Sequence, residues 1–247
     1  MIEIRNATIQ RDGITILEDI SLKADESQIV TIIGESGCGK STLLRAIMHL
    51  IPIVAGEIWI DGVLINGLSE HQMDEVRKRM GMVFQEGALF DSMNVRENVA
   101  FALRQHTRMK EAEIRRTVTE RLEAVGLADA EEKTPSQLSG GMRRRVAIAR
   151  ALALHPKILL YDEPTTGLDP ILTETILDLI VRMRDRYRTT TIVVTHDMDA
   201  AIRISDRIAL IHDKRIAAEG DVEYMKNNPD PLLRRFLHEH ADENTDH

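Results

Sequence analysis

The sequence is poor in the features that mark secreted and membrane-spanning chains. It has a single cysteine, Cys38, which leaves no internal disulfide and suits a reducing compartment. Residues 1–5 favour a strand and show neither the basic segment nor the apolar segment of a secretory signal. No apolar run approaches the roughly 18 residues that cross a bilayer. We therefore expect any membrane attachment to come through partner subunits.

Basic residues are also in the minority. The chain has 32 Lys and Arg against 40 Asp and Glu, and the formal net charge of −8 argues against a protein that binds nucleic acid. Two local basic clusters, Arg77-Lys78-Arg79 and Arg143-Arg144-Arg145, are interpreted as solvated helix faces.

A hydrophobic content of 43% over 247 residues is enough for one substantial core. We expect a single domain over residues 1–240.

Turn signals in the first third of the chain predict antiparallel hairpins. Asp12-Gly13 precedes the apolar run at residues 14–17, and Asp61-Gly62 separates residues 58–60 from residues 63–65. An Asp-Gly pair between apolar segments is a strong short-range hairpin signal. We therefore predict an antiparallel β subdomain near the N-terminus.

The middle of the chain changes to a helical pattern. From about residue 95 to residue 154 apolar residues recur at helical spacing, and strand signals vanish. The chain then continues with a strand-like run at residues 157–161, a helix face that includes Leu172 and a second strand-like run at residues 191–195, in that order. Strand, helix, strand is typical of a parallel α/β sheet. Residues 228–231, with two prolines, precede a short amphipathic tail.

A phosphate-binding loop occupies residues 34–41, between a strand-like run and a helix-compatible run. Glycines let backbone N–H groups close around phosphate oxygens, while Lys40 reaches the β- and γ-phosphates and Ser41 offers a hydroxyl to Mg²⁺. Cys38 is interpreted as an inert thiol, because no nearby base in the sequence activates it. The predicted nucleotide-binding residues are Gly34, Glu35, Ser36, Gly37, Cys38, Gly39, Lys40, Ser41 and Thr42.

An acidic pair follows one of the predicted strands. The strand at residues 158–161 delivers Asp162 and Glu163 to its C-terminal end, where α/β folds place ligand chemistry. Asp162 is suited to holding Mg²⁺, mainly through a water, and Glu163 to polarising an attacking water as general base. An isolated acidic pair would be an ordinary strand exit. The phosphate loop upstream favours the catalytic interpretation.

A second glycine-containing segment, Leu138-Ser139-Gly140-Gly141, precedes a run of helix formers. Hydroxyl and N–H groups at a helix N-terminus favour phosphate oxygens, so the segment predicts an anion site. This segment resembles the signature motif of the ATP-binding cassette (ABC) family. The resemblance to that family also includes the phosphate loop, Asp162-Glu163 and Thr195-His196-Asp197.

The resemblance covers residues 2–220 and rests on six ordered motifs. It implies an α/β fold, with a RecA-like P-loop NTPase core, an antiparallel β subdomain and an inserted α-helical subdomain. We place the core at residues 1–90 and 156–225, the helical subdomain at 91–155 and a C-terminal tail at 226–247.

The activity that the resemblance implies is hydrolysis of ATP, with Mg²⁺, coupled to transport. Ser139, Gly140 and Gly141 would then bind the γ-phosphate of ATP held by the other cassette of a homodimer. Met142 stands where the family usually has Gln, which puts polar side-chain contacts in question but leaves the backbone site.

Further roles come from the resemblance alone. His196 is implied to be the switch histidine that contacts the γ-phosphate and helps to position the base and water. Gln85 matches the Q-loop residue that touches the metal and the nucleophilic water. Residues 165–170 match the D-loop at the dimer interface, and Asp169 is also a helix-start signal. Arg11 stands where the family usually has an aromatic residue that stacks on adenine. The planar guanidinium of Arg11 can stack on a base in the same way. The alternative interpretation is that Arg11 is an ordinary exposed residue of the hairpin.

The transported substrate is indicated by finer likenesses. Residues 77–95, the Met142 variant of the signature and residues 228–231 together resemble the ATPases of Mla/MCE-type phospholipid transporters of bacterial envelopes. That resemblance implies maintenance of outer-membrane lipid asymmetry, a peripheral place on the cytoplasmic face of the inner membrane, a permease, and MCE-domain and small accessory subunits. Residues 87–90 lie in the region that contacts the permease in ABC importers, or alternatively pack the helical lobe.

Other functions remain as alternatives. An importer of amino acids or another small solute shares every catalytic motif. An ABC ATPase that acts on chromosomes needs a long coiled-coil insertion, for which the spacing between the motifs leaves no room, and one that acts on the ribosome usually has two cassettes. Glu163 and His196 argue against a nucleotide sensor without catalysis.

Overall fold

The computed structural model describes residues 1–243, and the chain divides into two compact units. The first unit comprises residues 1–73 and the chain from residue 190 onward, and the second comprises Asp74–Thr189. The partition into a core and a helical lobe at residues 90/91 and 155/156 stays a prediction. Within residues 1–243, no helix is both long and apolar enough to span a membrane.

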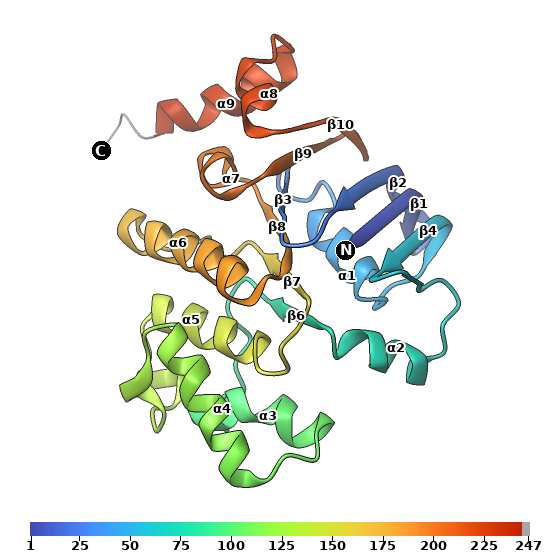
Figure 1. Cartoon of the computed structure of the whole chain (residues 1–247). Coiled ribbons are helices and arrows are strands. Elements are labelled where there is room, and N and C mark those ends of the chain that lie inside the picture. Colours follow the sequence, from blue (N-terminus) through green and yellow to red (C-terminus); the bar gives the residue numbers. More distant parts are fainter. Residues whose placement is uncertain (244–247) are drawn as a thin grey trace. The chain divides into compact units, whose positions relative to one another are not determined.

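The first unit contains an antiparallel sheet in the order β2-β1-β4-β5 (Figure 1). Its strands are β1 (Ile2–Arg11), β2 (Ile14–Ala24), β4 (Ile53–Ile60) and β5 (Val63–Leu64). Both predicted hairpins are present, since Asp12-Gly13 joins β1 to β2 and Asp61-Gly62 joins β4 to β5. All four turn residues have positive φ, between 49° and 78°, as two-residue turns that match the twist of the strands require.

The same unit holds the strand that precedes the phosphate loop. β3 (Ile29–Ile33) pairs in parallel with β8 (Thr190–Thr195) and β9 (Arg207–His212), and β10 (Arg215–Gly220) runs antiparallel to β9. Every residue of β3 and β8 is buried, which explains their uninterrupted apolar and threonine-rich sequences. The unit's helices are α1 (Lys40–Ile47), α7 (Met198–Ile204), α8 (Val222–Asn227) and α9 (Pro231–Glu243).

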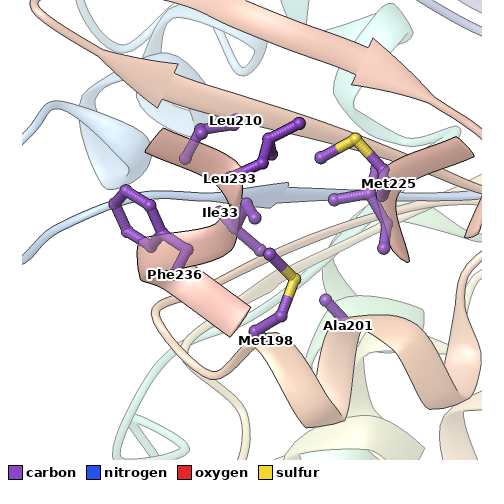
Figure 2. Packing of buried hydrophobic residues seen from close by; sticks show 8 residues of the cluster. Ile33, Met198, Ala201, Leu210, Met225, Leu233 and Phe236 are labelled. Atoms are coloured by element: carbon purple, nitrogen blue, oxygen red, sulfur yellow. The ribbon is translucent and has the colours of Figure 1, made fainter. Parts of the chain in front are cut away.

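Helix α9 is held by an apolar cluster that it forms with β3, β9, α7 and α8 (Figure 2). Leu233 and Phe236 of α9 pack with Ile33 of β3, Leu210 of β9 and Met198 of α7. The segment predicted to be an amphipathic tail forms a helix with a buried face. Residues 244–247 of that tail lie outside the described residues.

The second unit is mainly helical. Its strands β6 (Met80–Val83) and β7 (Ile158–Asp162) are parallel and buried. Its helices are α3 (Val95–His106), α4 (Glu111–Ala124), α5 (Gly140–Ala151) and α6 (Pro170–Tyr187). Short 3₁₀ turns lie at Ala128–Ala130 and Pro135–Gln137. Helix α2 (Glu70–Arg77) crosses the sequence boundary between the two units. Helices α3, α4 and α5 pack together, as the helical pattern predicted (Figure 1). The predicted α/β fold class, with parallel strands, is confirmed.

We expect the α9 cluster to contribute measurably to stability. Leu233→Ala removes a side chain that is 1% exposed, and the lost burial and the cavity should lower the free energy of unfolding by about 2–5 kcal/mol. Leu50→Ala, at a site that is 55% exposed, is the matched control and should change it by less than about 0.5 kcal/mol. Urea unfolding of the full chain measures both. Equal midpoints for the two variants would show that α9 does not dock as described.

Candidate functional site

The phosphate loop follows β3 and leads directly into α1. Gly34 has φ 155°, and a Cβ there would lie 2.6 Å from the carbonyl oxygen of Ile211, so the loop leaves the sheet in a space that only glycine fits. Gly39 precedes the helix with φ 109°, and α1 begins at Lys40. The loop therefore owes its path to its glycines, as the motif predicted.

Lys40 is held inside this loop. Its side chain is 5% exposed, and Nζ donates to the carbonyl oxygens of Gly34 at 2.7 Å and Glu35 at 3.1 Å. The ammonium group is thus fixed within the curve of the loop backbone. A positive charge in that place attracts phosphate oxygens. Ser41 and Thr42 follow in the first turn of α1, and both are partly exposed.

Cys38 lies in the loop as a free, partly buried thiol. Burial raises the pKa of Cys38, and the nearby Lys40 ammonium only partly opposes that change. A raised pKa leaves less thiolate at neutral pH, and the thiolate is the reactive species. This agrees with the interpretation of Cys38 as an inert residue.

Two further predicted residues lie in the first unit. His196 follows the last residue of β8, and the next residue, Asp197, caps α7 by accepting a hydrogen bond from the Ala200 N–H at 2.9 Å. The strand end and the cap fix the backbone on either side of His196. Arg11 ends β1; its side chain is 70% exposed and lies 3.7 Å from Asp12. Stacking of Arg11 on adenine stays a prediction.

The remaining predicted residues belong to the second unit, where the acidic pair ends a buried strand. Asp162 is the last residue of β7 and is 8% exposed, and Glu163 is the first residue beyond it. Glu163 has φ 48°, in the left-handed region that residues with a Cβ rarely adopt. Its carboxylate accepts a hydrogen bond from the hydroxyl of Thr166 at 3.0 Å. Sequence reasoning did not find the role of Thr166, because nothing in its residue type or spacing signals the contact.

The Ser-Gly-Gly segment forms the predicted helix start. Ser139 is the N-cap of α5, and its hydroxyl accepts a hydrogen bond from the Met142 N–H at 3.2 Å. Gly141 is buried, and a Cβ there would lie 3.0 Å from the Leu172 side chain. Asp169 likewise caps α6 by accepting from the Leu172 N–H at 2.9 Å, which confirms it as a helix start.

The basic cluster that follows was expected to be solvated, and for Arg144 this was wrong. Arg144 is 7% exposed, and burial lowers its pKa. Its guanidinium donates to the carbonyl oxygens of Pro164 at 3.0 Å and Thr166 at 2.9 Å. Arg144 lies three residues after Gly141 on the buried face of α5, so helical periodicity could have revealed its burial.

Gln85 follows β6 and is exposed. The chain after it is tightly held, because Arg150 of α5 donates to the carbonyl oxygens of Gly87 at 2.8 Å and Ala88 at 2.6 Å. Asn98 of α3, fully buried, accepts from the Phe90 N–H at 2.8 Å and donates to the Phe90 carbonyl oxygen at 3.1 Å. Residues 87–90 therefore form a fixed loop, although the Phe90 side chain is 41% exposed.

The predicted metal ligands fit magnesium in their chemistry. Ser41, Asp162 and Gln85 offer hydroxyl, carboxylate and amide oxygens, and oxygen is the ligand that Mg²⁺ prefers. Over residues 1–243, no three His, Cys, Asp or Glu side chains gather into a metal-binding group. Mg²⁺ at nucleotide sites is usually held by one or two carboxylates together with phosphates and waters, and Asp162 supplies one carboxylate.

Comparisons with known proteins place these residues in context. The sequence profile of the ABC transporter family matches residues 17–166. The intermembrane phospholipid transport system ATP-binding protein MlaF of Haemophilus influenzae is 43% identical over 98% of this chain and 92% of its own length. The probable ribonucleotide transport ATP-binding protein mkl of Mycobacterium leprae is 39% identical over 96% of this chain and 68% of its own length. A solved dimeric post-hydrolysis state of the ATP-binding cassette MJ0796, bound to ADP and Pi, has a TM-score of 0.82 at 35% identity, covering 90% of this chain and 99% of that chain.

The place of Cys38 in the phosphate loop predicts how it reacts. Because the pKa of Cys38 is raised, a thiol reagent should label the nucleotide-free chain more slowly than it labels a small free thiol at neutral pH. The difference between the two labelling rates should become smaller as the pH rises above ~8.5, where a free thiol ionises. Bound ATP should protect Cys38. Labelling is followed by mass spectrometry between pH 7 and pH 10, and Cys38→Ser gives the background. Equal labelling rates with and without ATP would contradict nucleotide binding at this loop.

Proposed function

This chain belongs to the ABC transporter family, and on that premise we propose that it is the ATP-hydrolysing subunit of a bacterial phospholipid transporter of the Mla type. The observation that carries the proposal is its near full-length similarity to MlaF, in a chain that keeps a phosphate loop, an acidic pair and a histidine in the family's order. The nucleotide supplies the energy, and the transported lipid is handled by other subunits.

Nucleotide binding would begin at the phosphate loop. The Lys40 ammonium, already held within the loop by two carbonyl oxygens, would contact the β- and γ-phosphates. The N–H groups that precede α1 would add donors for the phosphate oxygens. Arg11 would stack on the adenine. Magnesium, when bound, would neutralise phosphate charge during the reaction, held by Ser41, Asp162 and Gln85.

Hydrolysis would depend on a base and two positioning contacts. Glu163 would take the proton of the attacking water, and His196 would contact the γ-phosphate. Gln85 would help to place the same water. Glu163 directly follows a buried strand, which holds its backbone in a defined place, as general-base catalysis needs.

A second copy of the chain would complete each site. Ser139, Gly140 and Gly141 lie at the start of α5, where backbone N–H groups and the positive end of the helix suit the γ-phosphate of ATP bound to the partner copy. The dimeric state of the MJ0796 cassette supports this arrangement. Met142 donates its N–H to Ser139 and does not need a polar side chain for that contact.

The coupling surface is proposed to be the loop at residues 87–90. Its backbone is fixed by Arg150 and Asn98, and the Phe90 ring packs against Phe101 with centroids 4.8 Å apart while staying partly exposed. An apolar side chain on a rigid loop suits docking, because little conformational entropy is lost on binding. We propose an integral-membrane permease as its partner, together with MCE-domain and small accessory subunits. The chain would then be peripheral to the cytoplasmic face of the inner membrane.

The alternative is an importer of small solutes. The mkl relative is named for probable ribonucleotide transport, and an amino-acid importer would use the same hydrolytic residues. The ATPase site does not discriminate among these substrates, so the choice rests on transport itself.

We predict that Glu163→Gln abolishes turnover and keeps ATP affinity, because the neutral amide preserves the shape of the side chain and loses its basicity. The fall in kcat should be about a hundredfold or more, as expected for loss of a general base. Glu123→Gln, at an exposed site on α4, is the matched control and should behave as wild type. Steady-state ATPase assays and nucleotide titrations measure the two quantities. Wild-type turnover in Glu163→Gln would remove Glu163 from the mechanism.

Reconstitution of the purified complex in liposomes tests the substrate. We expect ATP to drive movement of labelled phospholipid and no uptake of labelled amino acids or ribonucleotides. Replacing Leu89 and Phe90 with Ser should weaken association with the permease and slow lipid movement, because each apolar side chain contributes ~1.5–3 kcal/mol if fully buried on docking. Val54→Ser, at a site that is 54% exposed, is the control and should not affect docking. ATP-driven solute uptake without lipid movement would establish the importer instead.

A further inference from the structure

The carboxylate of Glu163 is held by a side chain that the proposed mechanism does not use. Thr166 donates its hydroxyl hydrogen to Oε2 of Glu163 at 3.0 Å, and its N–H lies 3.4 Å from the Glu163 carbonyl oxygen. Both residues are partly buried, so the hydrogen bond is sheltered from bulk water. A hydrogen bond to a given carboxylate oxygen favours particular directions for the lone pairs of that group. The Thr166 hydroxyl thus restricts how the Glu163 side chain turns.

The backbone that carries this hydroxyl is held from α5. Arg144 is almost fully buried and donates Nε to the Pro164 carbonyl oxygen and Nη2 to the Thr166 carbonyl oxygen. A guanidinium presents its donors in a fixed planar arrangement, so two carbonyls that it bridges are held at a fixed separation. The residues on both sides of Thr165 are therefore tied to α5, the helix that Ser139 caps.

The conformation of Glu163 makes such support necessary. Its backbone has φ 48°, which costs free energy for a residue with a Cβ and persists only where neighbouring contacts hold it. The contacts from Thr166 and Arg144 are made within three residues of Glu163, the first from the turn that follows β7 and the second from α5. They provide that support at the residue to which the proposed function assigns the base.

We propose that Thr166 is a positioning residue for hydrolysis, which orients Glu163 through its hydroxyl while Arg144 of the signature helix α5 holds the loop in place. This rests on the proposed function, in which Glu163 is the general base. Ser139 caps α5 and Arg144 belongs to the same helix. The contacts of Arg144 therefore connect the segment proposed to bind the partner's γ-phosphate with the turn that carries the proposed base of this chain. ATP affinity does not depend on this hydrogen bond, so the effect falls on kcat.

The test removes only the hydroxyl. In the full chain, Thr166→Val keeps the branched shape of the side chain. It should lower kcat for ATP hydrolysis by about tenfold to a hundredfold, which is the range expected for loss of a hydrogen bond to a charged group. KM should change by less than about twofold. Thr166→Ser restores a hydroxyl and should recover most of the lost turnover. Rescue by serine separates the hydrogen bond from a packing role of the side chain.

Thr119→Val is the matched control. The Thr119 hydroxyl also donates to a glutamate carboxylate, that of Glu131 at 2.8 Å, in the same unit, but that pair has no part in the proposed chemistry. It should leave kcat unchanged, and thermal unfolding of all variants checks that they are folded. Wild-type kcat in Thr166→Val would overturn the proposal, as would a loss that serine does not rescue or a loss confined to KM.

Failure of the premise is recognised separately. If Glu163→Gln keeps wild-type turnover, the assignment of the base is wrong, and the positioning role falls with it. If Glu163→Gln is inactive and Thr166→Val is fully active, the base assignment stands and only the role of Thr166 is overturned. ATP titrations on each variant show whether binding changed.

Discussion

Full burial of parallel strands is the constraint on which the arrangement of this protein depends. Every residue of β3, β7 and β8 is buried, so polar chemistry begins only where each strand ends. The phosphate loop follows β3, Asp162 closes β7, and His196 follows β8. Buried backbone must satisfy its hydrogen bonds within the sheet, which fixes these ends more firmly than a free loop would be. Each unit therefore delivers its reactive side chains from a rigid support.

Much of this was predictable because the signals are local. The Asp-Gly turns of the two hairpins, the glycines of the phosphate loop and the helix starts at Ser139 and Asp169 each depend on residues a few positions apart. Such contacts follow from backbone conformation and capping, which residue types reveal directly. β3, β7 and β8 were equally visible as short apolar runs, whereas β6 was not predicted.

The features that escaped prediction join residues distant in sequence or depend on conformation. Arg144 carries a charge, which favours solvent, yet it is buried because two carbonyl oxygens about twenty residues further along the chain accept its hydrogen bonds. The positive φ of Glu163 belongs to a residue type that rarely adopts it, so its sequence gives no warning. In both cases tertiary contacts outweigh the local preference of the residue.

The contacts of α5 show how one helix can serve two tasks. Its first residues form the proposed phosphate site, Arg144 in its second turn holds the loop beside Glu163, and Arg150 in its last turn holds residues 87–90. Burial lowers the pKa of both arginines, and each compensates for the loss of hydration by donating to two backbone carbonyls. Because the helix is a rigid rod over this length, a shift at its start must be accommodated at both loops. Substrate identity does not enter these contacts. If the proposed roles hold, hydrolysis and docking would depend on the same element.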